Sequence, residues 1–297
     1  MATNALYLGR EWNVEHDQRV AVDDAELRYA VLGEGEPVLC IHGTSIADSL
    51  ITPLRFYPDL LDRYQFISYY RAGYNGSTLH KDTLSIEEGA NHAKQLLDHL
   101  GIDKTHLMAF SFGGVIAFQF LLSYAERAHS AILLEPYLPR EDKDAVQANV
   151  DAYMAAMEKY QGGDKLGAAL LYMEAVCGPR FLSSVDMTGP LDVWRRVEEC
   201  VDTTFQVDFP ALSSWGFKMS EADRLVAAKP TMPVLATLGL DSEAAMPGFR
   251  ETQRFLLDWL PQAERCGIPF ATHGMQSMNP LAVGEAALAF LSRHPMS

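Results

Sequence analysis

Ser111 stands in the apolar stretch HLMAFSFGGVIAFQF, where a predicted strand gives way to a predicted helix. Ala109 and Gly113 lie two positions before and after it, and a tight, strained strand-to-helix turn requires such small neighbours. The turn would lift the hydroxyl clear of the sheet and set it at the helix N-terminus, where the backbone N–H of Phe112 can stabilise an oxyanion. The spacing predicts a nucleophilic serine. The alternative is that Ser111 only caps the helix.

The elements that would position this serine follow from the pattern of apolar residues. Short apolar runs alternate with amphipathic stretches, as is typical of strands and crossover helices on a mostly parallel sheet. A capping box of Ser85 and Glu88 predicts the start of a helix that ends at Gly101. The predicted strands are 19–22, 26–31, 37–41, 64–70, 105–110, 129–136, 231–239 and 264–271, and helices are predicted over 249–260 and 281–294.

The strand pattern disappears between residues 139 and 229, where the periodicity predicts about four helices. Insertions in such folds lie over the carboxyl ends of the strands. We therefore expect a core domain of residues 1–138 and 230–297 and a helical cap, or lid, of residues 139–229. Its Met and aromatic residues either line a pocket or pack the cap's own helices; these are Met154, Met157, Tyr172, Met173, Phe205 and Trp215.

Three segments, VLCIHGTS, YYRAGYNGS and AFSFGG, follow one another along the chain. They resemble the oxyanion segment, a structural loop and the nucleophile elbow of the α/β-hydrolase family, and the resemblance runs nearly end to end. The family usually writes the loop as D-x-R-G-x-G-x-S, but here Tyr69 replaces the acid and Ala72 the first glycine. Ala109 replaces the more frequent glycine of the elbow and keeps the turn sterically feasible.

This resemblance implies the fold and part of the site. The fold class is α/β, with the mostly parallel central sheet of the α/β-hydrolase fold flanked by helices and carrying an inserted helical cap. The backbone N–H of Thr44, the residue after His42 and a glycine, is implied to form the oxyanion hole together with that of Phe112.

A serine is a poor nucleophile at neutral pH unless a base accepts its proton and an acid orients the base. In the family's order of serine, acid and histidine, the base lies in a loop after the last strand. The stretch IPFATHGMQSMNP places His273 there. Among the nine histidines, the local sequence around His42 and His106 also allows a role as the base, but neither lies at a strand end late in the chain.

The acid has three candidates. Asp241 follows the penultimate strand two residues after Gly239, where the family usually has a spacing of three, and it is our first prediction. The alternatives are Glu243, four residues after the same glycine, and Glu135 at the end of the preceding strand, a position that some family members use. Any carboxylate beside the imidazole could orient it. Asp241 could instead form only a local turn.

Composition limits the classes of function. The 297 residues are 48% hydrophobic and 21% charged, which is typical of an ordinary globular protein. A formal net charge of -15 argues against nucleic acid and anionic membranes as partners. We expect a small-molecule substrate and allow for a homodimer. The start MATNALYLGREWNVEHDQ lacks the layout of a secretory signal and no long uncharged apolar run appears, so we expect a cytoplasmic protein.

The sequence offers no cofactor or metal motif. The cysteines, at positions 40, 177, 200 and 266, form no C-x-x-C pair. Neither a dinucleotide-binding glycine motif after a strand, nor a phosphate loop, nor an H-E-x-x-H pair is present. We therefore expect no metal and no cofactor.

The predicted chemistry is acyl transfer, with Ser111 as nucleophile, His273 as base and water completing the turnover. It predicts a serine hydrolase that cleaves an ester or lactone of a small, largely apolar molecule, that is, a carboxylic ester hydrolase or lactonase. One alternative is a carbon-carbon bond hydrolase of the ring-cleavage type, whose elbow SFGG also resembles. Another is a non-hydrolytic member such as a lyase, a cofactor-free oxygenase or a ligand receptor, since fold does not determine function.

Overall fold

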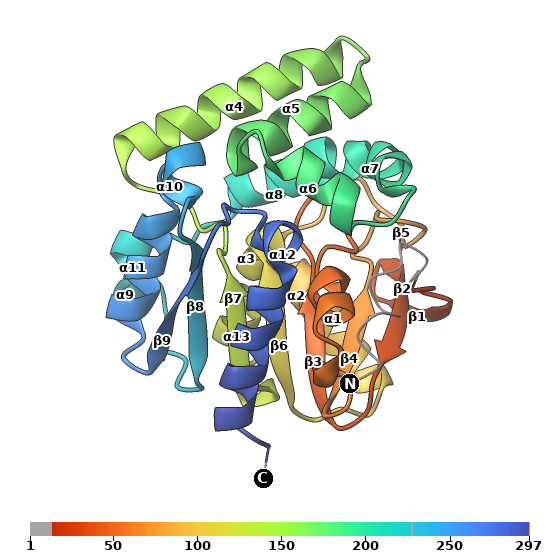
Figure 1. The fold of residues 1–297 in the computed structure, drawn as a ribbon, viewed down its shortest axis with the longest axis vertical. Coiled ribbons are helices and arrows are strands. Elements are labelled where there is room, and N and C mark those ends of the chain that lie inside the picture. The colour runs from red at the N-terminus through yellow and green to blue at the C-terminus, as the bar shows by residue number, and fades with distance from the viewer. Residues whose placement is uncertain (1–13, 227, 297) are drawn as a thin grey trace.

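The computed structural model of the protein describes residues 14–226 and 228–296. Most of the N-terminal stretch that bears on a secretory signal lies outside these residues. A nine-stranded sheet runs through the described part in the order β1-β2-β4-β3-β6-β7-β8-β9, with β5 paired to β2 off this path (Figure 1). From β4 to β9 in that order neighbouring strands are parallel, whereas β1 and β2 form the predicted antiparallel hairpin at one edge.

The strands agree with the predicted ones to within a few residues, and the two-residue β5 is an addition. They are β1 (Gln18–Val22), β2 (Ala25–Leu32), β3 (Glu36–Ile41), β4 (Tyr64–Tyr69), β5 (Thr78–Leu79), β6 (Thr105–Phe110), β7 (Ala128–Leu134), β8 (Val234–Gly239) and β9 (Ala263–Ile268). Every residue of β6 and of β8 is buried. Burial on both faces is what parallel strands covered by helices require.

Helices cover both faces of the sheet because successive strand residues point to opposite sides. Val38 and Cys40 of β3 pack with α1 (Ile51–Phe56) and α13 (Pro280–Arg293). Leu39 and Ile41 belong to the larger cluster on the other face, which includes side chains of three further helices. These are α2 (Ile86–His99), α3 (Ser111–Ser123) and α11 (Phe249–Trp259). Helix α2 begins at the predicted capping box of Ser85 and Glu88.

The segment between β7 and β8 is helical, as predicted. It contains α4 (Lys143–Gln161), α5 (Lys165–Cys177), α6 (Phe181–Thr188), α7 (Val193–Asp202), the π-helix η3 (Thr203–Asp208), α8 (Phe209–Ser214), η4 (Met219–Glu221) and α9 (Ala222–Leu225). Helices α4 to α8, here called the inserted helices, lie over the end of the sheet where β7 finishes (Figure 1). The periodicity did not reveal α6, which is only two turns long.

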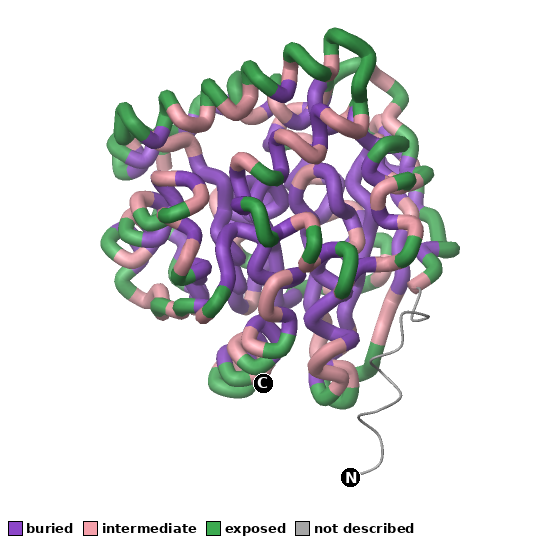
Figure 2. The backbone as a smooth tube through the Cα atoms, turned by 45° about the horizontal axis from the view of Figure 1, so that its top comes forward, coloured by how far each residue is buried: buried purple, intermediate pink, exposed green. Residues whose placement is uncertain are grey.

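Short elements join the rest: η1 (Pro58–Leu60), η2 (Ala125–Arg127), α10 (Ser242–Ala245) and α12 (Met275–Met278). Burial follows the layers, with the central strands buried and α4 exposed over most of its outer length (Figure 2). Over the described ranges, no helix combines the length and the apolarity needed to cross a membrane.

A buried histidine beside the end of β4 makes stability depend on pH. His16 stacks on Tyr70 at 3.9 Å between ring centroids, and its Nε2 lies 2.9 Å from Ser68 Oγ. Burial lowers the pKa of His16 from 6.5 to about 4. The unfolded chain therefore takes up this proton first as the pH falls, and the stability that the neutral ring supports is lost between about pH 6.5 and pH 4.

We expect the free energy of unfolding to fall by about 2 kcal/mol more in the wild type than in His16→Phe between pH 7 and pH 5. Phenylalanine keeps the stacking on Tyr70 but does not titrate. Denaturant unfolding at both pH values measures the difference. Equal losses in the two proteins would show that His16 is not the group responsible.

Candidate active site

The turn between β6 and α3 holds Ser111 in the left-handed region, with φ at 53°, which is uncommon for a residue other than glycine. A Cβ on Gly113 would lie 2.1 Å from the carbonyl oxygen of Ile41, so only glycine fits there. Ala109 is fully buried. Helix α3 begins at Ser111, and the N-cap position belongs to Phe110. The turn has the predicted form, and Ser111 is not the helix cap.

Ser111 is hydrogen-bonded to His273, which is hydrogen-bonded to Glu135. The distance from Ser111 Oγ to His273 Nε2 is 2.8 Å, and that from His273 Nδ1 to Glu135 Oε2 is also 2.8 Å. Both ring contacts are buried. Because a carboxylate only accepts, Nδ1 donates to Glu135, and Nε2 is left to accept from the serine hydroxyl. This is the arrangement of nucleophile, base and orienting acid.

Two neighbouring strand ends bring Glu135 to the histidine. Glu135 directly follows β7, which pairs in parallel with β8. The backbone N–H of Gly239, at the end of β8, donates to Glu135 Oε1 at 2.5 Å, and the hydroxyl of Ser242 donates to the same oxygen at 2.6 Å. These bonds fix the carboxylate so that Oε2 faces His273. Glu135 also has a positive φ, 42°, which aims its side chain away from the strand direction.

The prediction that Asp241 orients His273 is wrong. Asp241 Oδ2 accepts from Arg180 Nη2 at 3.2 Å, and its side chain is 46% exposed. Glu243 accepts from the backbone N–H of Arg250 instead. The carboxylate beside the imidazole is the third candidate, Glu135. The two-residue spacing from Gly239 puts Asp241 on the surface, just before α10.

The electrostatics favour a neutral imidazole. Burial lowers the pKa of His273 below its usual value; Glu135 opposes this shift and the Arg140 cation adds to it. Phe249 lies between the two, with its ring stacked on His273 at 4.2 Å and its centroid 4.4 Å from Arg140 Cζ. A neutral ring at pH 7 can accept the serine proton.

Backbone donors border the serine hydroxyl. Gly43 lies against the turn, since a Cβ on it would be 3.2 Å from Ser111 Cβ. The next residue, Thr44, lines the same pocket as Ser111 and Phe112. Within the described part of the chain, the backbone N–H groups of Thr44 and Phe112 donate to no protein acceptor. Neither N–H is therefore engaged within the described protein, and their role in an oxyanion hole stays a prediction.

A buried ion pair supports the loop that carries Thr44. Arg71 donates to the carbonyl oxygens of His42 and Gly43 at 3.1 and 3.0 Å. Its guanidinium also binds Asp208 of η3 in a bidentate manner, at 2.9 and 2.6 Å, and both side chains are at most 3% exposed. Tyr74 donates to the same carboxylate at 2.7 Å. The Arg71 loop, read from the sequence as structural, thus connects the oxyanion segment to the inserted helices.

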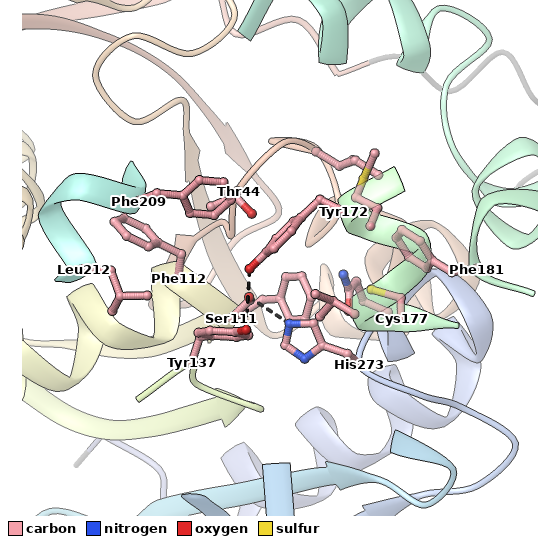
Figure 3. A pocket seen from close by; sticks show the side chains of 15 residues that line it. Thr44, Ser111, Phe112, Tyr137, Tyr172, Cys177, Phe181, Phe209, Leu212 and His273 are labelled. Atoms are coloured by element: carbon pink, nitrogen blue, oxygen red, sulfur yellow. Dashed lines mark hydrogen bonds between the residues drawn. The ribbon is translucent and has the colours of Figure 1, made fainter. Parts of the chain in front are cut away.

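A pocket opens above Ser111 and His273 (Figure 3). Side chains of the inserted helices form much of its wall. The lining residues are Thr44, Ile46, Phe110, Ser111, Phe112, Tyr137, Tyr172, Met173, Val176, Cys177, Phe181, Phe209, Leu212, His273 and Gln276. No Lys, Arg, Asp or Glu is among them. The pocket therefore suits a neutral and largely apolar molecule.

Of the Met and aromatic residues weighed as pocket residues, Tyr172 and Met173 line it. Met154 is exposed, Phe205 stacks on Tyr160, and Trp215 packs against Phe118 and Phe217. Phe181 and Phe209 also line the wall and were not predicted from the sequence. Phe181 belongs to α6, which the periodicity did not reveal. Phe209 is followed by a proline, and the residues around it show no helical periodicity.

In the described ranges, no group of three or more His, Cys, Asp or Glu side chains is arranged to hold a metal ion. The four cysteines are free thiols, three of them buried. Burial raises the pKa of Cys177, the thiol in the pocket wall. A raised pKa leaves this thiol protonated and weakly nucleophilic.

Comparisons with known proteins bear on the fold. Residues 36–169 match the family model described as alpha/beta hydrolase fold. The chain is 32% identical over 117 residues to the uncharacterized hydrolase YcgS of Bacillus subtilis, covering 39% of this chain and 40% of that protein. It is also 32% identical over 122 residues to 2-hydroxy-6-oxo-6-phenylhexa-2,4-dienoate hydrolase of Comamonas testosteroni, covering 39% and 41%. The matches thus span about two fifths of the length of these relatives.

Among solved structures, a thermophilic esterase from Thermogutta terrifontis superposes with a TM-score of 0.72 at 20% identity. The alignment covers 94% of this chain and 100% of the esterase. This likeness establishes the fold over nearly the whole chain. Together with the match of residues 36–169 to the family model, it shows that the chain has the alpha/beta hydrolase fold.

Proposed function

We propose that the protein is a serine hydrolase that cleaves an ester or lactone bond of a small, neutral, largely apolar molecule. The observation that carries the proposal is the continuous contact from Ser111 Oγ through His273 to Glu135, at 2.8 Å in each step. Ser111 attacks the carbonyl carbon while His273 Nε2 takes its proton. The N–H groups of Thr44 and Phe112 hold the negative oxygen that forms.

The reaction then proceeds through an acyl-enzyme. His273 gives the proton to the leaving alkoxide, and the carbon-oxygen bond of the ester breaks. Water, deprotonated by the same imidazole, attacks the acyl carbon and releases the acid with regeneration of the Ser111 hydroxyl. Glu135 holds the ring in the correct tautomer and stabilises the imidazolium that forms in each half.

A carbon-carbon bond hydrolase remains the second candidate, because the relative from Comamonas testosteroni is a dienoate hydrolase. A dienoate carries a carboxylate, and burying an unpaired anion is costly. The absence of Lys and Arg from the pocket lining supports the neutral ester or lactone over an anionic substrate. The inserted helices, in this proposal, act as the cap that excludes water from the acyl-enzyme's surroundings.

The test is labelling with a fluorophosphonate probe, followed by peptide mapping, alongside turnover assays. We expect the label on Ser111, no label in Ser111→Ala, and hydrolysis of 4-nitrophenyl butyrate or γ-butyrolactone. Faster cleavage of a ring-cleavage dienoate would favour the carbon-carbon hydrolase. A folded protein that takes no label and turns over none of these compounds would contradict the proposal and favour a lyase, oxygenase or receptor.

A further inference from the structure

Helix α5 contributes one hydroxyl to the pocket wall, that of Tyr172, beside Met173, Val176 and Cys177. The Tyr172 ring packs edge-on against Phe209 of α8, with 4.8 Å between the ring centroids, and the residue keeps 8% of its surface exposed. Its hydroxyl points into the pocket, toward Ser111 and Tyr137 (Figure 3). A polar group on an inserted helix thus faces the side chains that would react.

The contacts of Tyr137 place this hydroxyl close to the triad. Tyr172 Oη lies 3.5 Å from Tyr137 Oη. The backbone N–H of Tyr137 donates to the carbonyl oxygen of Ser111 at 3.1 Å, and the Tyr137 ring centroid is 6.0 Å from that of His273. Both tyrosines line the same pocket as Ser111 and His273. A molecule bound with its carbonyl at Ser111 can therefore extend to the Tyr172 hydroxyl.

The proton of the Tyr172 hydroxyl has only a long contact inside the protein. Hydrogen bonds between two oxygen atoms are usually about 2.7 Å long, whereas Tyr172 Oη and Tyr137 Oη are 3.5 Å apart. Tyr137 is engaged elsewhere, since it donates to Asn149 and accepts from Arg140 Nη1 at 3.2 Å. Over residues 14–226 and 228–296, the Tyr172 hydroxyl has no other hydrogen-bond partner. A bound acceptor can replace this long contact at little cost.

Tyr172 is held in the form and position of a donor before any substrate binds. Burial raises the pKa of Tyr172 well above its usual range, so the hydroxyl keeps its proton. Its neighbour Phe209 also contacts Phe205 and Tyr153 of α4, with ring centroids 5.2 and 5.3 Å away. Packing on this aromatic group fixes the ring of Tyr172, and a fixed donor loses less entropy on binding than a mobile one.

We propose that Tyr172 is a specificity-determining residue whose hydroxyl donates a hydrogen bond to the substrate. The substrate class becomes an ester or lactone that carries a second neutral acceptor, a carbonyl or ether oxygen, besides the reacting carbonyl. The acceptor is neutral, because none of the lining residues is a Lys or Arg that could pair with an anion. This inference rests on the proposed hydrolase function and adds a polar requirement to it.

The experiment compares esters that differ only in the second acceptor. The first pair is 4-nitrophenyl 4-oxopentanoate and 4-nitrophenyl 4-methylenepentanoate, and the second is the corresponding 5-oxohexanoate and 5-methylenehexanoate. Each ester is assayed with the wild type and with Tyr172→Phe, so that differences in intrinsic reactivity cancel. In at least one pair, we expect Tyr172→Phe to lower kcat/KM about fivefold more on the oxo ester, the value of one neutral hydrogen bond. Equal losses within both pairs would overturn the inference.

A matched variant separates recognition from a merely structural role. Tyr172→Phe keeps the ring packed on Phe209, so its melting temperature should stay within about 3 °C of the wild type. Tyr153→Phe removes the hydroxyl of another tyrosine that contacts Phe209 but does not line the pocket. It should leave the ratio of the two rates within each pair unchanged. A ratio that shifts as much in Tyr153→Phe as in Tyr172→Phe would mean that packing around Phe209 selects the substrate, and would overturn the assignment.

Failure of the proposed function would look different. It would appear as an absence of both turnover of 4-nitrophenyl butyrate and labelling by the fluorophosphonate. In that case, thermal-shift binding of the methyl esters of the same four acids, in the wild type and Tyr172→Phe, decides the role of Tyr172. A preference for an oxo ester that is confined to the wild type supports the role, and equal stabilisation by both members of each pair overturns it.

Discussion

Glu135→Gln is expected to lower kcat on a neutral ester by on the order of 10⁴-fold, while Asp241→Asn leaves it within about twofold. The glutamine oxygen can still accept from Gly239 and Ser242, so the strand ends stay joined. Its amide nitrogen then faces His273 Nδ1, and two donors oppose each other. The ring adopts the other tautomer or turns away, and Nε2 no longer accepts the proton of Ser111.

Steady-state kinetics with 4-nitrophenyl butyrate measures both variants, and Asp241→Asn is the matched control because it neutralises a nearby carboxylate outside the contact chain. Far-ultraviolet circular dichroism and melting curves should confirm that Glu135→Gln is folded. A large loss in Asp241→Asn with an active Glu135→Gln would mean that the acid is supplied by a rearranged loop after β8.

The positions of Ser111 and His273 beside each other could be predicted because local spacing determines each of them. The turn at Ser111 needs small residues at fixed offsets, and Gly113 sits 2.1 Å, at its missing Cβ, from a carbonyl of β3. His273 lies in a short loop that directly follows the last strand and is bounded by a helix. Both constraints act within a few residues and are visible in the order of residue types.

The acid could not be decided in this way because its position depends on which strands are neighbours. Glu135 reaches His273 only since β7 pairs with β8 and a donor from Gly239 turns its carboxylate. Asp241 has a more familiar position in sequence but points to solvent and pairs with Arg180. A local sequence pattern does not show which carboxylate accepts a hydrogen bond from the end of a neighbouring strand.

The residues of the pocket wall could not be predicted from local sequence patterns either. Helices α5, α6 and α8 each contribute one face to the pocket wall. Which face of a helix lines the pocket and which packs against other helices depends on the angles at which the helices cross. Tyr172 and Phe205 illustrate this, because both are buried aromatics of the inserted helices but only Tyr172 lines the pocket.

Asp208→Ala is expected to lower the free energy of unfolding by about 3–5 kcal/mol, because it leaves the buried Arg71 cation without its counter-charge. Arg71 would then shift toward water or another acceptor and release the carbonyls of His42 and Gly43. A displacement of the segment before Thr44 should lower kcat by on the order of 10²-fold, since the oxyanion donor leaves its position. Urea unfolding and ester kinetics measure the two effects.

The exposed pair of Arg195 and Glu199 provides the matched control, with side chains 59% and 53% exposed. Glu199→Ala should change stability by less than about 1 kcal/mol and leave kcat unaltered. The double variant Arg71→Leu/Asp208→Leu removes both charges, so it should be more stable than Asp208→Ala. It should nevertheless stay slow, because the carbonyls of the oxyanion segment still lack the donors that Arg71 supplied. If the double variant recovered full activity, the ion pair would serve stability alone, and the oxyanion segment would hold its shape without it.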